Sequence, residues 1–528
     1  MSFPSVFHNL CIDQFPHRPH TPNHISCLFS QPNHHSTDYL SLCTSMPVMP
    51  TSKGSNSGNG RVYRRKELWV EDGRGERSAL GNRSLVLLSL RCIDPFHRQV
   101  TAGRLPDVVL LEIFDFYIEG EDYLLDDWQI LLHVCRRWRN VVFSSPHRLD
   151  IQLICKPGRS VTEMLNIWPE LPIFVMYDDP PVDTDDVIAA LKLKGSVSKI
   201  ELVVNSGSAV WEKFAAVMQD PFPMLEHLSV ESYYGMTPVI SDSFLGGSAP
   251  RLQSVFFRDI LFPALPILLL SATDLVDLFL WDIPHSAYIS PEAMVTCVSE
   301  LTRLKSLSLH FRSPRSRPDS VFLHPLRRAL LPALTNLQFK GVPEYLEDLV
   351  ARIDVPLLER TGIIFFNQLI FDVSQLPDLV CRTETFTVLD QADVVLDSDS
   401  IRIQFRPKDG AVNFIRRLDL EISCPKLDWQ LSALAQVCNS CLPTLPSLER
   451  LSICEYQYSP LLWQDDVENT QWLELLQPFA TVKNLYLSKK VALCVASALQ
   501  ELSKERVTGL LPALQDIFID GLRPPGLV

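Results

Sequence analysis

Apolar residues recur from residue 197 onward in the motif Leu-x-x-Leu-x-Leu. Clear copies are Leu275-x-x-Leu278-x-Leu280 and Leu304-x-x-Leu307-x-Leu309. The last two leucines of a copy alternate with other residues, and a period of two is typical of a β-strand. Twelve copies, some with Val, Ile or Phe in place of Leu, follow one another at a mean spacing of about 29 residues. They begin at Val197, Leu225, Leu252, Leu275, Leu304, Leu334, Leu358, Phe386, Ile415, Leu448, Val482 and Leu514.

Helical stretches and prolines separate these copies. Proline ends a preceding segment and admits a short strand after it, and residues such as 186–194 have a helical pattern. We therefore predict strand–helix units that stack as an α/β solenoid over residues 151–528. Residues 397–399, Asp-Ser-Asp, lie between two β-rich runs and predict a hairpin that interrupts the series. Proline stands two positions before six of the copies, at Pro223, Pro250, Pro332, Pro356, Pro446 and Pro512.

A small helical unit is predicted over residues 104–150. Leu105 and Pro106 begin the first helix, since proline is tolerated in a first helical turn. The second helix starts near residues 126–127, and a third, short helix contains Trp138. The apolar positions of the first two helices fall on single faces; they are Val109, Leu110, Ile113 and Phe114, then Trp128, Leu131, Leu132 and Val134.

The first 83 residues are rich in Pro, His, Ser, Asn and Gly. They cannot bury enough apolar surface to offset their conformational entropy, so we predict a disordered tail over 1–83 and a linker over 84–103. His17, His20, His24 and Cys27 have spacings that a metal could use, but a His- and Pro-rich tail explains them better, since nothing there predicts folded strands. The basic run 61–66 is either a nuclear-import signal or, as we favour, a solvated cluster.

Net charge and cysteine content restrict the class of protein to which the chain can belong. The chain of 528 residues has a formal charge of −14, which disfavours a general nucleic-acid-binding protein. The longest uncharged apolar run, 260–273, is shorter than the roughly 20 residues of a membrane span. The N-terminus lacks the pattern of a secretory signal, so the 13 cysteines indicate reduced thiols in the cytosol or nucleus. We expect neither a nucleic-acid nor a membrane partner.

Motifs of catalysis are not found in the sequence. It contains no Gly-x-Gly-x-x-Gly, no phosphate-binding Gly-Lys-Ser/Thr loop, no Gly-x-Ser-x-Gly and no His-Glu-x-x-His. The acidic run 177–186 fits a solvated turn before a helix better than a metal site. Cys438 and Cys441 form the single Cys-x-x-Cys; ordinary buried thiols are favoured over a metal or redox pair. The chain is thus predicted not to be an enzyme and to hold no cofactor or metal.

The helical unit resembles an F-box. The resemblance covers about 45 residues: Leu105-Pro106, then Ile113-Phe114, then Val134-Cys135-Arg136-Arg137-Trp138, in the family's order. The spacing from Phe114 to Val134 is about six residues longer than usual in the family, and the excess lies in residues 119–127. The repeats resemble leucine-rich repeats, although Tyr233, Ile260, Ile283 and Val342 stand where that family has Asn or Cys. The fold expected is therefore α+β, an all-α three-helix F-box followed by an irregular solenoid.

An F-box followed by leucine-rich repeats implies a substrate-recognition adaptor of a Skp–cullin–F-box ubiquitin ligase. By this resemblance the F-box binds a Skp-family linker, which connects it to the cullin, through Leu105, Pro106, Val109, Leu110, Ile113, Phe114, Leu131, Val134 and Cys135. The repeats would bind a protein substrate, and outward-facing aromatic candidates are Phe256, Phe279, Trp281, His310, Tyr486 and Phe518. The alternative is a non-ligase repeat scaffold for protein–protein interaction with a vestigial F-box.

Removal of the N-terminal tail is the first test. A chain that starts near Gly103 should keep the melting temperature of the full-length protein, because residues 1–83 have too few apolar residues to contribute to a core. Thermal unfolding followed by circular dichroism measures this. A large loss of stability in the shortened chain would contradict the prediction.

Overall fold

The computed structural model describes residues 105–519 with gaps, the longest being 119–127, 315–326, 408–416, 457–467 and 501–508. The predicted disordered tail and linker therefore lie outside the described residues. The chain divides into two compact units at Leu149/Asp150. Among the described residues, no helix has both the length and the apolar character needed to cross a bilayer.

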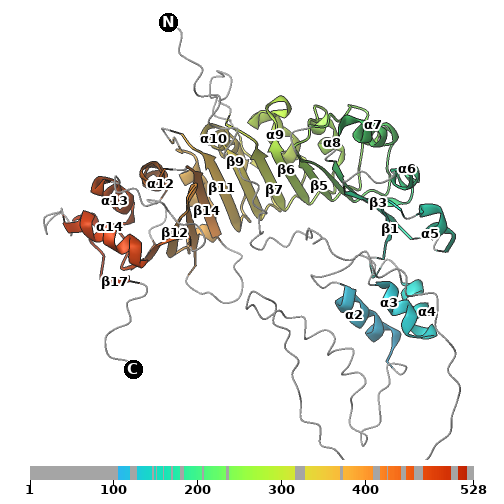
Figure 1. The fold of residues 1–528 in the computed structure, drawn as a ribbon. Coiled ribbons are helices and arrows are strands. Elements are labelled where there is room, and N and C mark those ends of the chain that lie inside the picture. Colours follow the sequence, from blue (N-terminus) through green and yellow to red (C-terminus); the bar gives the residue numbers. More distant parts are fainter. Residues whose placement is uncertain are drawn as a thin grey trace, which may run out of the picture. The chain divides into compact units, whose positions relative to one another are not determined.

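The described part of the first unit contains three helices, α2 (Asp107–Ile118), α3 (Trp128–Val134) and α4 (Arg136–Ser144) (Figure 1). Its core forms around Trp138, which is 4% exposed and meets Phe114 edge-on with ring centroids 4.8 Å apart. Leu110 and Val142 are also fully buried. Each helix thus contributes one apolar side to a single small core.

The run from Cys135 to Trp138 joins α3 to α4. Cys135 has an extended backbone and caps α4, its Sγ accepting a hydrogen bond from the backbone N–H of Trp138 at 3.5 Å. Arg137 pairs with Asp107 at 2.6 Å and donates to the carbonyl of Leu105. These contacts fix the start of α2 against the start of α4, so this part of the sequence motif has a structural role.

The described residues of the second unit form one 15-stranded sheet, with strand order β1-β2-β3-β4-β5-β6-β7-β9-β11-β14-β13-β12-β15-β16-β17. All neighbours are parallel except β12/β13 and β13/β14. The strands are β1 (Leu153–Cys155), β2 (Ile173–Asp178), β3 (Val197–Val204), β4 (His227–Ser232), β5 (Ser254–Arg258), β6 (Asp277–Ile283), β7 (Ser306–Phe311), β9 (Asn336–Gly341), β11 (Arg360–Phe366), β12 (Gln391–Leu396), β13 (Ser400–Arg406), β14 (Arg417–Ser423), β15 (Arg450–Glu455), β16 (Asn484–Leu487) and β17 (Asp516–Ile519).

Helices follow most strands, and α6 to α10 lie together on one side of the sheet (Figure 1). A separate small sheet pairs β8 (Ala329–Leu330) with β10 (Ile353–Asp354). The helices are α5 (Val161–Ile167), α6 (Asp185–Leu191), α7 (Gly207–Val217), α8 (Leu265–Ser271), α9 (Pro291–Ser299), α10 (Pro343–Arg352), α11 (Leu376–Arg382), α12 (Leu427–Cys441), α13 (Asn469–Leu476) and α14 (Lys489–Gln500). Short 3₁₀ turns occur at 244–247, 285–287, 384–386 and 477–479.

The leucine motif explains this stacking. The first residue of a copy precedes the strand, and the next two lie on the strand with their side chains toward the helices. Leu278, Leu307 and Leu337 pair in register on β6, β7 and β9, and each is at most 1% exposed. The described part of the chain therefore has the predicted solenoid of strand–helix repeats, with a continuous apolar core on its helix side.

Two details differ from the sequence prediction. The sheet begins earlier than the first copy at Val197, because β1 and β2 already pair in parallel and continue into β3. The copy placed at Phe386 is shifted by three residues. Phe386 is buried in a 3₁₀ turn, and Leu389 takes the position before β12. Ile415 lies outside the described residues.

The predicted hairpin at residues 397–399 is confirmed. β12 and β13 pair antiparallel from Gln391↔Arg406 to Leu396↔Ile401. β13 then pairs antiparallel with β14, which joins β11, while β12 joins β15. Three strands are thus inserted in the order β14-β13-β12, and the sheet continues without an open edge between β11 and β15.

Replacing Trp138 with Ala tests the core of the first unit. We expect a loss of about 3–5 kcal/mol in the free energy of unfolding. That loss should unfold so small a unit, because few residues share its core. Hydrogen exchange measured by mass spectrometry should show loss of protection in α2–α4 and unchanged protection in the sheet.

Phe116→Ala serves as the matched control, since Phe116 is 67% exposed in the same unit. It should leave exchange nearly unchanged. Retained protection of α2–α4 in the Trp138 variant would show that this side chain is not the core anchor.

Candidate functional site

The face of the sheet that lies opposite the buried leucines carries a cluster of rings on β5, β6 and β7. We call Phe256, Phe279, Trp281 and His310 the aromatic patch. The centroid of Phe256 lies 6.2 Å from that of Phe279 and 5.3 Å from that of Trp281. His310 stacks on Trp281 at 5.1 Å with an interplanar angle of 13°. All four side chains are half-buried, so they support one another and still present surface.

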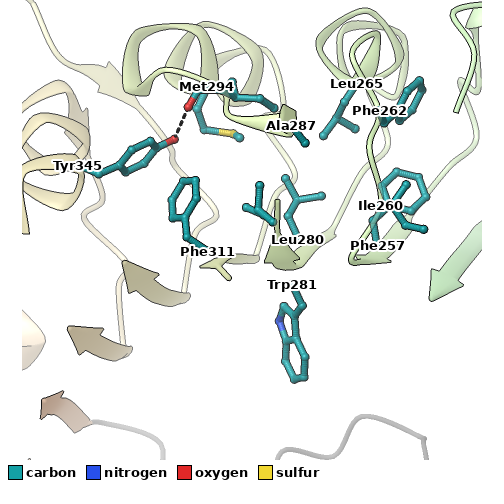
Figure 2. A pocket seen from close by; sticks show the side chains of 12 residues that line it. Phe257, Ile260, Phe262, Leu265, Leu280, Trp281, Ala287, Met294, Phe311 and Tyr345 are labelled. Carbon is teal, nitrogen blue, oxygen red and sulfur yellow. Dashed lines mark hydrogen bonds between the residues drawn. The ribbon is translucent and has the colours of Figure 1, made fainter. Parts of the chain in front are cut away.

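Trp281 is the centre of this patch. Its indole Nε1 donates a hydrogen bond to Ser308 Oγ on β7 at 2.9 Å, which orients the ring across the next strand. Figure 2 shows the ring pointing away from the neighbouring side chains that line a pocket on the helix side of the strands. The Trp281 ring is therefore part of the open face and not of the core.

The pocket itself is small and apolar. Its volume is about 30 Å³, and among its lining residues are Phe257, Met294 and Phe311. Tyr345 contacts it and donates from Oη to the carbonyl of Ile289 at 3.0 Å (Figure 2). A cavity of this size has room for about one water molecule and offers it few polar partners. It is a packing gap between the sheet and its helices.

Charged side chains form one rim of the aromatic patch. The Arg258 guanidinium carbon lies 4.8 Å from the ring centroid of Tyr233 and 5.9 Å from that of Trp281. Its Nε donates to Asp282 at 2.9 Å. Burial, the largest single effect, would lower the pKa of Arg258, but Asp282, Tyr233 and Glu231 together outweigh it and the pKa is raised. Arg258 is therefore held charged between two rings.

Tyr233 and Glu231 extend the rim toward β4. Tyr233 Oη donates to Glu231 Oε2 at 2.6 Å. Burial raises the pKa of the Glu231 carboxyl above its ordinary value, although the hydrogen bond from Tyr233 opposes this. Burial, followed by the nearby Glu231 charge, raises the pKa of the Tyr233 hydroxyl well above its usual range. The phenol stays protonated and acts as a donor.

Two aspartates at this rim have a left-handed backbone. Asp259 and Asp282 both have φ +51°, and they occupy equivalent places because Arg258 pairs with Trp281. Such backbone costs energy in residues other than glycine and persists only where surrounding contacts hold it. Asp259 is 5% exposed and accepts bonds from Thr237 at 3.0 Å and Arg312 at 3.1 Å. The rim is thus fixed by its own polar contacts.

His310 is neutral at physiological pH. Burial lowers its pKa to about 4, and the Lys340 charge adds to this effect. A neutral imidazole can stack on Trp281 and still offer one donor and one acceptor. The patch therefore combines three apolar rings with one polar ring.

The other two predicted substrate-binding aromatics lie elsewhere. Tyr486 and Phe518 stack on β16 and β17 with centroids 4.5 Å apart, and the Arg450 guanidinium lies 4.0 Å from the Tyr486 ring. Strands β9, β11, β14, β13, β12 and β15 separate this pair from the aromatic patch. The structure therefore brings together four of the six predicted residues.

The sequence reasoning missed the polar rim of the patch, namely Glu231, Tyr233, Arg258 and Asp282. One signal was available, because Arg258 follows Phe256 by two positions and so shares its face of the strand.

The nine residues expected to bind a linker fall into three groups. Leu110, Phe114 and Leu131 are at most 2% exposed and belong to the core of the three-helix unit. Leu105 and Ile113 are half-buried, whereas Pro106, Val109, Val134 and Cys135 are exposed. The buried members offer almost no surface to a partner, and direct contact stays a prediction for the others.

The same unit exposes apolar side chains that the sequence reasoning did not select. Val108, Phe116 and Ile130 are 61%, 67% and 51% exposed. Phe116 follows Val109 by seven residues and therefore lies on the same helix face. We call Val108, Val109, Phe116, Ile130 and Val134 the apolar helix surface.

Metal-binding arrangements are not found in the part of the chain that the structure describes. No three His, Cys, Asp or Glu side chains there are grouped to hold an ion. Cys424 and Cys438 are buried thiols, and burial raises the pKa of Cys424.

Comparison with known proteins gives little beyond this geometry. No family model matches the chain, and no curated protein matches it. One solved structure that matches is the leucine-rich repeat-containing protein LegL7 from Legionella pneumophila. It is 12% identical, and the match covers 70% of this chain and 90% of that chain with a TM-score of 0.24. At that score the likeness adds nothing to what the strand order itself shows.

Acidification tests the environment of His310. The unfolded chain should bind a proton at this residue below about pH 6.5, whereas the folded chain should not until about pH 4. The stability linked to the neutral form is therefore present above pH 6.5 and lost as pH falls toward 4. Urea unfolding should show wild type losing on the order of 1–3 kcal/mol relative to His310→Gln over this window.

Phe518→Leu is the control, because Phe518 carries no titratable group and is 44% exposed. Its difference from wild type should stay nearly constant with pH. An equally constant difference for His310→Gln would contradict the assigned environment.

Proposed function

We propose that this chain is a substrate-recognition adaptor of a Skp–cullin–F-box ubiquitin ligase. The three-helix unit binds a Skp-family linker, and the open face of the solenoid binds a protein substrate. The observation that carries this proposal is the apolar helix surface, which lies on the same unit as the F-box-like motif. An adaptor performs no chemistry of its own; it raises the effective concentration of a substrate near a conjugating enzyme.

Support for linker binding comes from exposure. Five large apolar side chains on α2 and α3 are between 40% and 67% exposed. Exposed apolar side chains that share one face of a helix are typical of an interaction surface. Val109 and Phe116 lie on one face of α2, and Leu105 and Ile113 adjoin that face by helical spacing. Glu112 of α2 forms an exposed ion pair with Arg148 of the same unit.

Support for substrate binding comes from the aromatic patch. Tryptophan, arginine and tyrosine are the residues that most often dominate protein interfaces, and Trp281, Arg258 and Tyr233 meet here. The strands hold them in fixed orientations, which lowers the entropy lost when a partner binds.

A non-ligase scaffold is the second candidate. It is favoured by the longer spacing in the sequence between Phe114 and Val134, which the F-box pattern does not have. Such a scaffold would keep the substrate surface without the linker.

Linker capture decides between the two candidates. Leu105→Ala combined with Pro106→Ala should weaken binding of a purified Skp-family protein by tenfold or more. Leu105 would lose apolar contact area worth roughly 1.5–3 kcal/mol, and the carbonyl of residue 106, which accepts from the N–H of Val109 at 3.0 Å, would no longer be preset by proline. Isothermal titration calorimetry measures the affinity, and circular dichroism checks folding.

Leu493→Ala is the matched control, since Leu493 is 72% exposed on α14 of the solenoid. It should bind the linker with unchanged affinity. A folded Leu105/Pro106 variant with parental affinity would remove the adaptor role from this motif, and absence of binding in the parent would leave the scaffold.

A further inference from the structure

The outward side chains of the sheet change charge from strand to strand across the aromatic patch. On one side, β2, β3 and β4 carry three carboxylates, Asp178, Glu201 and Glu231, against one lysine, Lys199. Side chains alternate between the two faces along a strand, so all four lie on the face opposite the buried Tyr177, Ile200, Leu202, Leu228 and Val230, and Glu231 is 7% exposed there. This side of the patch is therefore net acidic.

The opposite side of the patch is net basic. Outward positions on β9 and β11 include Lys340 and Arg360 and no carboxylate. The strands between, β5 to β7, carry the aromatic patch with one basic residue on this face, Arg258, and two acidic ones, Asp277 and Asp282, of which Asp282 pairs with Arg258. A ligand that lies across the strands thus meets carboxylates, then rings, then cations.

The spacing of these groups selects a backbone conformation. Glu231, Trp281 and Lys340 stand on β4, β6 and β9, and each is separated from the next by one intervening strand. Strands lie about 4.8 Å apart, so the steps are about 10 Å. A polyproline II segment places every third side chain on one side at steps of about 9 Å. A β-strand would turn residue i+3 to the opposite side.

We propose that the aromatic patch binds a polyproline II segment that carries a basic, a large apolar and an acidic side chain at positions i, i+3 and i+6. The basic side chain lies over the carboxylates of β2–β4, the apolar one over Trp281 and Phe256, and the acidic one near Lys340. Aromatic-lined surfaces suit this conformation because its ordering entropy is small. The inference names the substrate class of the proposed adaptor and rests on that function for its biological role.

Fluorescence anisotropy with the full chain and synthetic peptides tests the inference. The probe is a labelled peptide of sequence Lys-Pro-Pro-Leu-Pro-Pro-Glu flanked by glycines. It should bind, and a peptide with Ser for the central Leu should bind at least about tenfold more weakly. A helical peptide with the same three side chains on one face should not compete. Absence of binding by the first peptide, or binding by the helical one alone, would overturn the inference.

Variants locate the binding site. Trp281→Ala should weaken the affinity for the labelled peptide by about tenfold or more. Trp429→Ala should leave this affinity unchanged, because Trp429 is exposed on α12. Lys340→Glu should weaken the affinity for the labelled peptide by about threefold or more. The same variant should bind a peptide with Lys at both ends more tightly than wild type does. Lys192→Glu changes the same charge next to α6 on the helix side and should alter neither affinity. Equal effects of Lys340→Glu and Lys192→Glu would place the peptide elsewhere and overturn the inference.

The linker assay on the same samples separates the two proposals. Peptide binding without linker capture would remove the ligase role and leave the recognition mode intact. Linker capture without peptide binding would overturn this inference alone. Circular dichroism identifies a variant that fails to fold, in which case Lys340→Glu, an exchange on the surface of the sheet, decides.

Discussion

The solenoid depends on one repeated contact, the packing of buried leucines between in-register neighbours on adjacent parallel strands. Leu307 lies between Leu278 and Leu337, and all three are covered from the helix side. Each strand buries its apolar side chains only because the next strand and helix are present. The same register fixes the outward positions, since side chains on a strand alternate between faces. The geometry of the aromatic patch is therefore a consequence of the core.

The three-helix unit shows a different balance between core and surface. Among its described residues ten apolar side chains are buried around Trp138 and Phe114, and five large ones are at least 40% exposed. Cys135 caps the start of α4, and Arg137 forms an ion pair with Asp107 at the start of α2. These polar contacts add to the apolar core in holding the helix ends together. A unit with this composition gains stability from a partner that covers its apolar helix surface.

The sequence predicted those parts of the fold that local periodicity encodes. The strands at Leu278, Leu307 and Leu337 follow from a period of two, and residues 397–399 indicated the hairpin. β1 and β2 were missed because Ile173, Phe174 and Val175 form a continuous buried run without the leucine motif. The polar rim of the aromatic patch could not be predicted from the sequence, for a different reason. Arg258 meets Tyr233 and Asp282 from neighbouring strands, and such contacts depend on register, which the spacing of single copies does not fix.

The antiparallel strand β13 has a consequence for how the array comes apart. In a solenoid of purely parallel repeats each repeat contacts only its neighbours, so repeats can unfold one at a time from an end. Here β14 pairs with β11 through Arg360↔Arg417, and β12 pairs with β15 through Gln391↔Arg450, so the antiparallel strands β12, β13 and β14 stand between two runs of parallel repeats. Opening that begins at β17 must disrupt this antiparallel block before it reaches β1 to β11, which carry the aromatic patch.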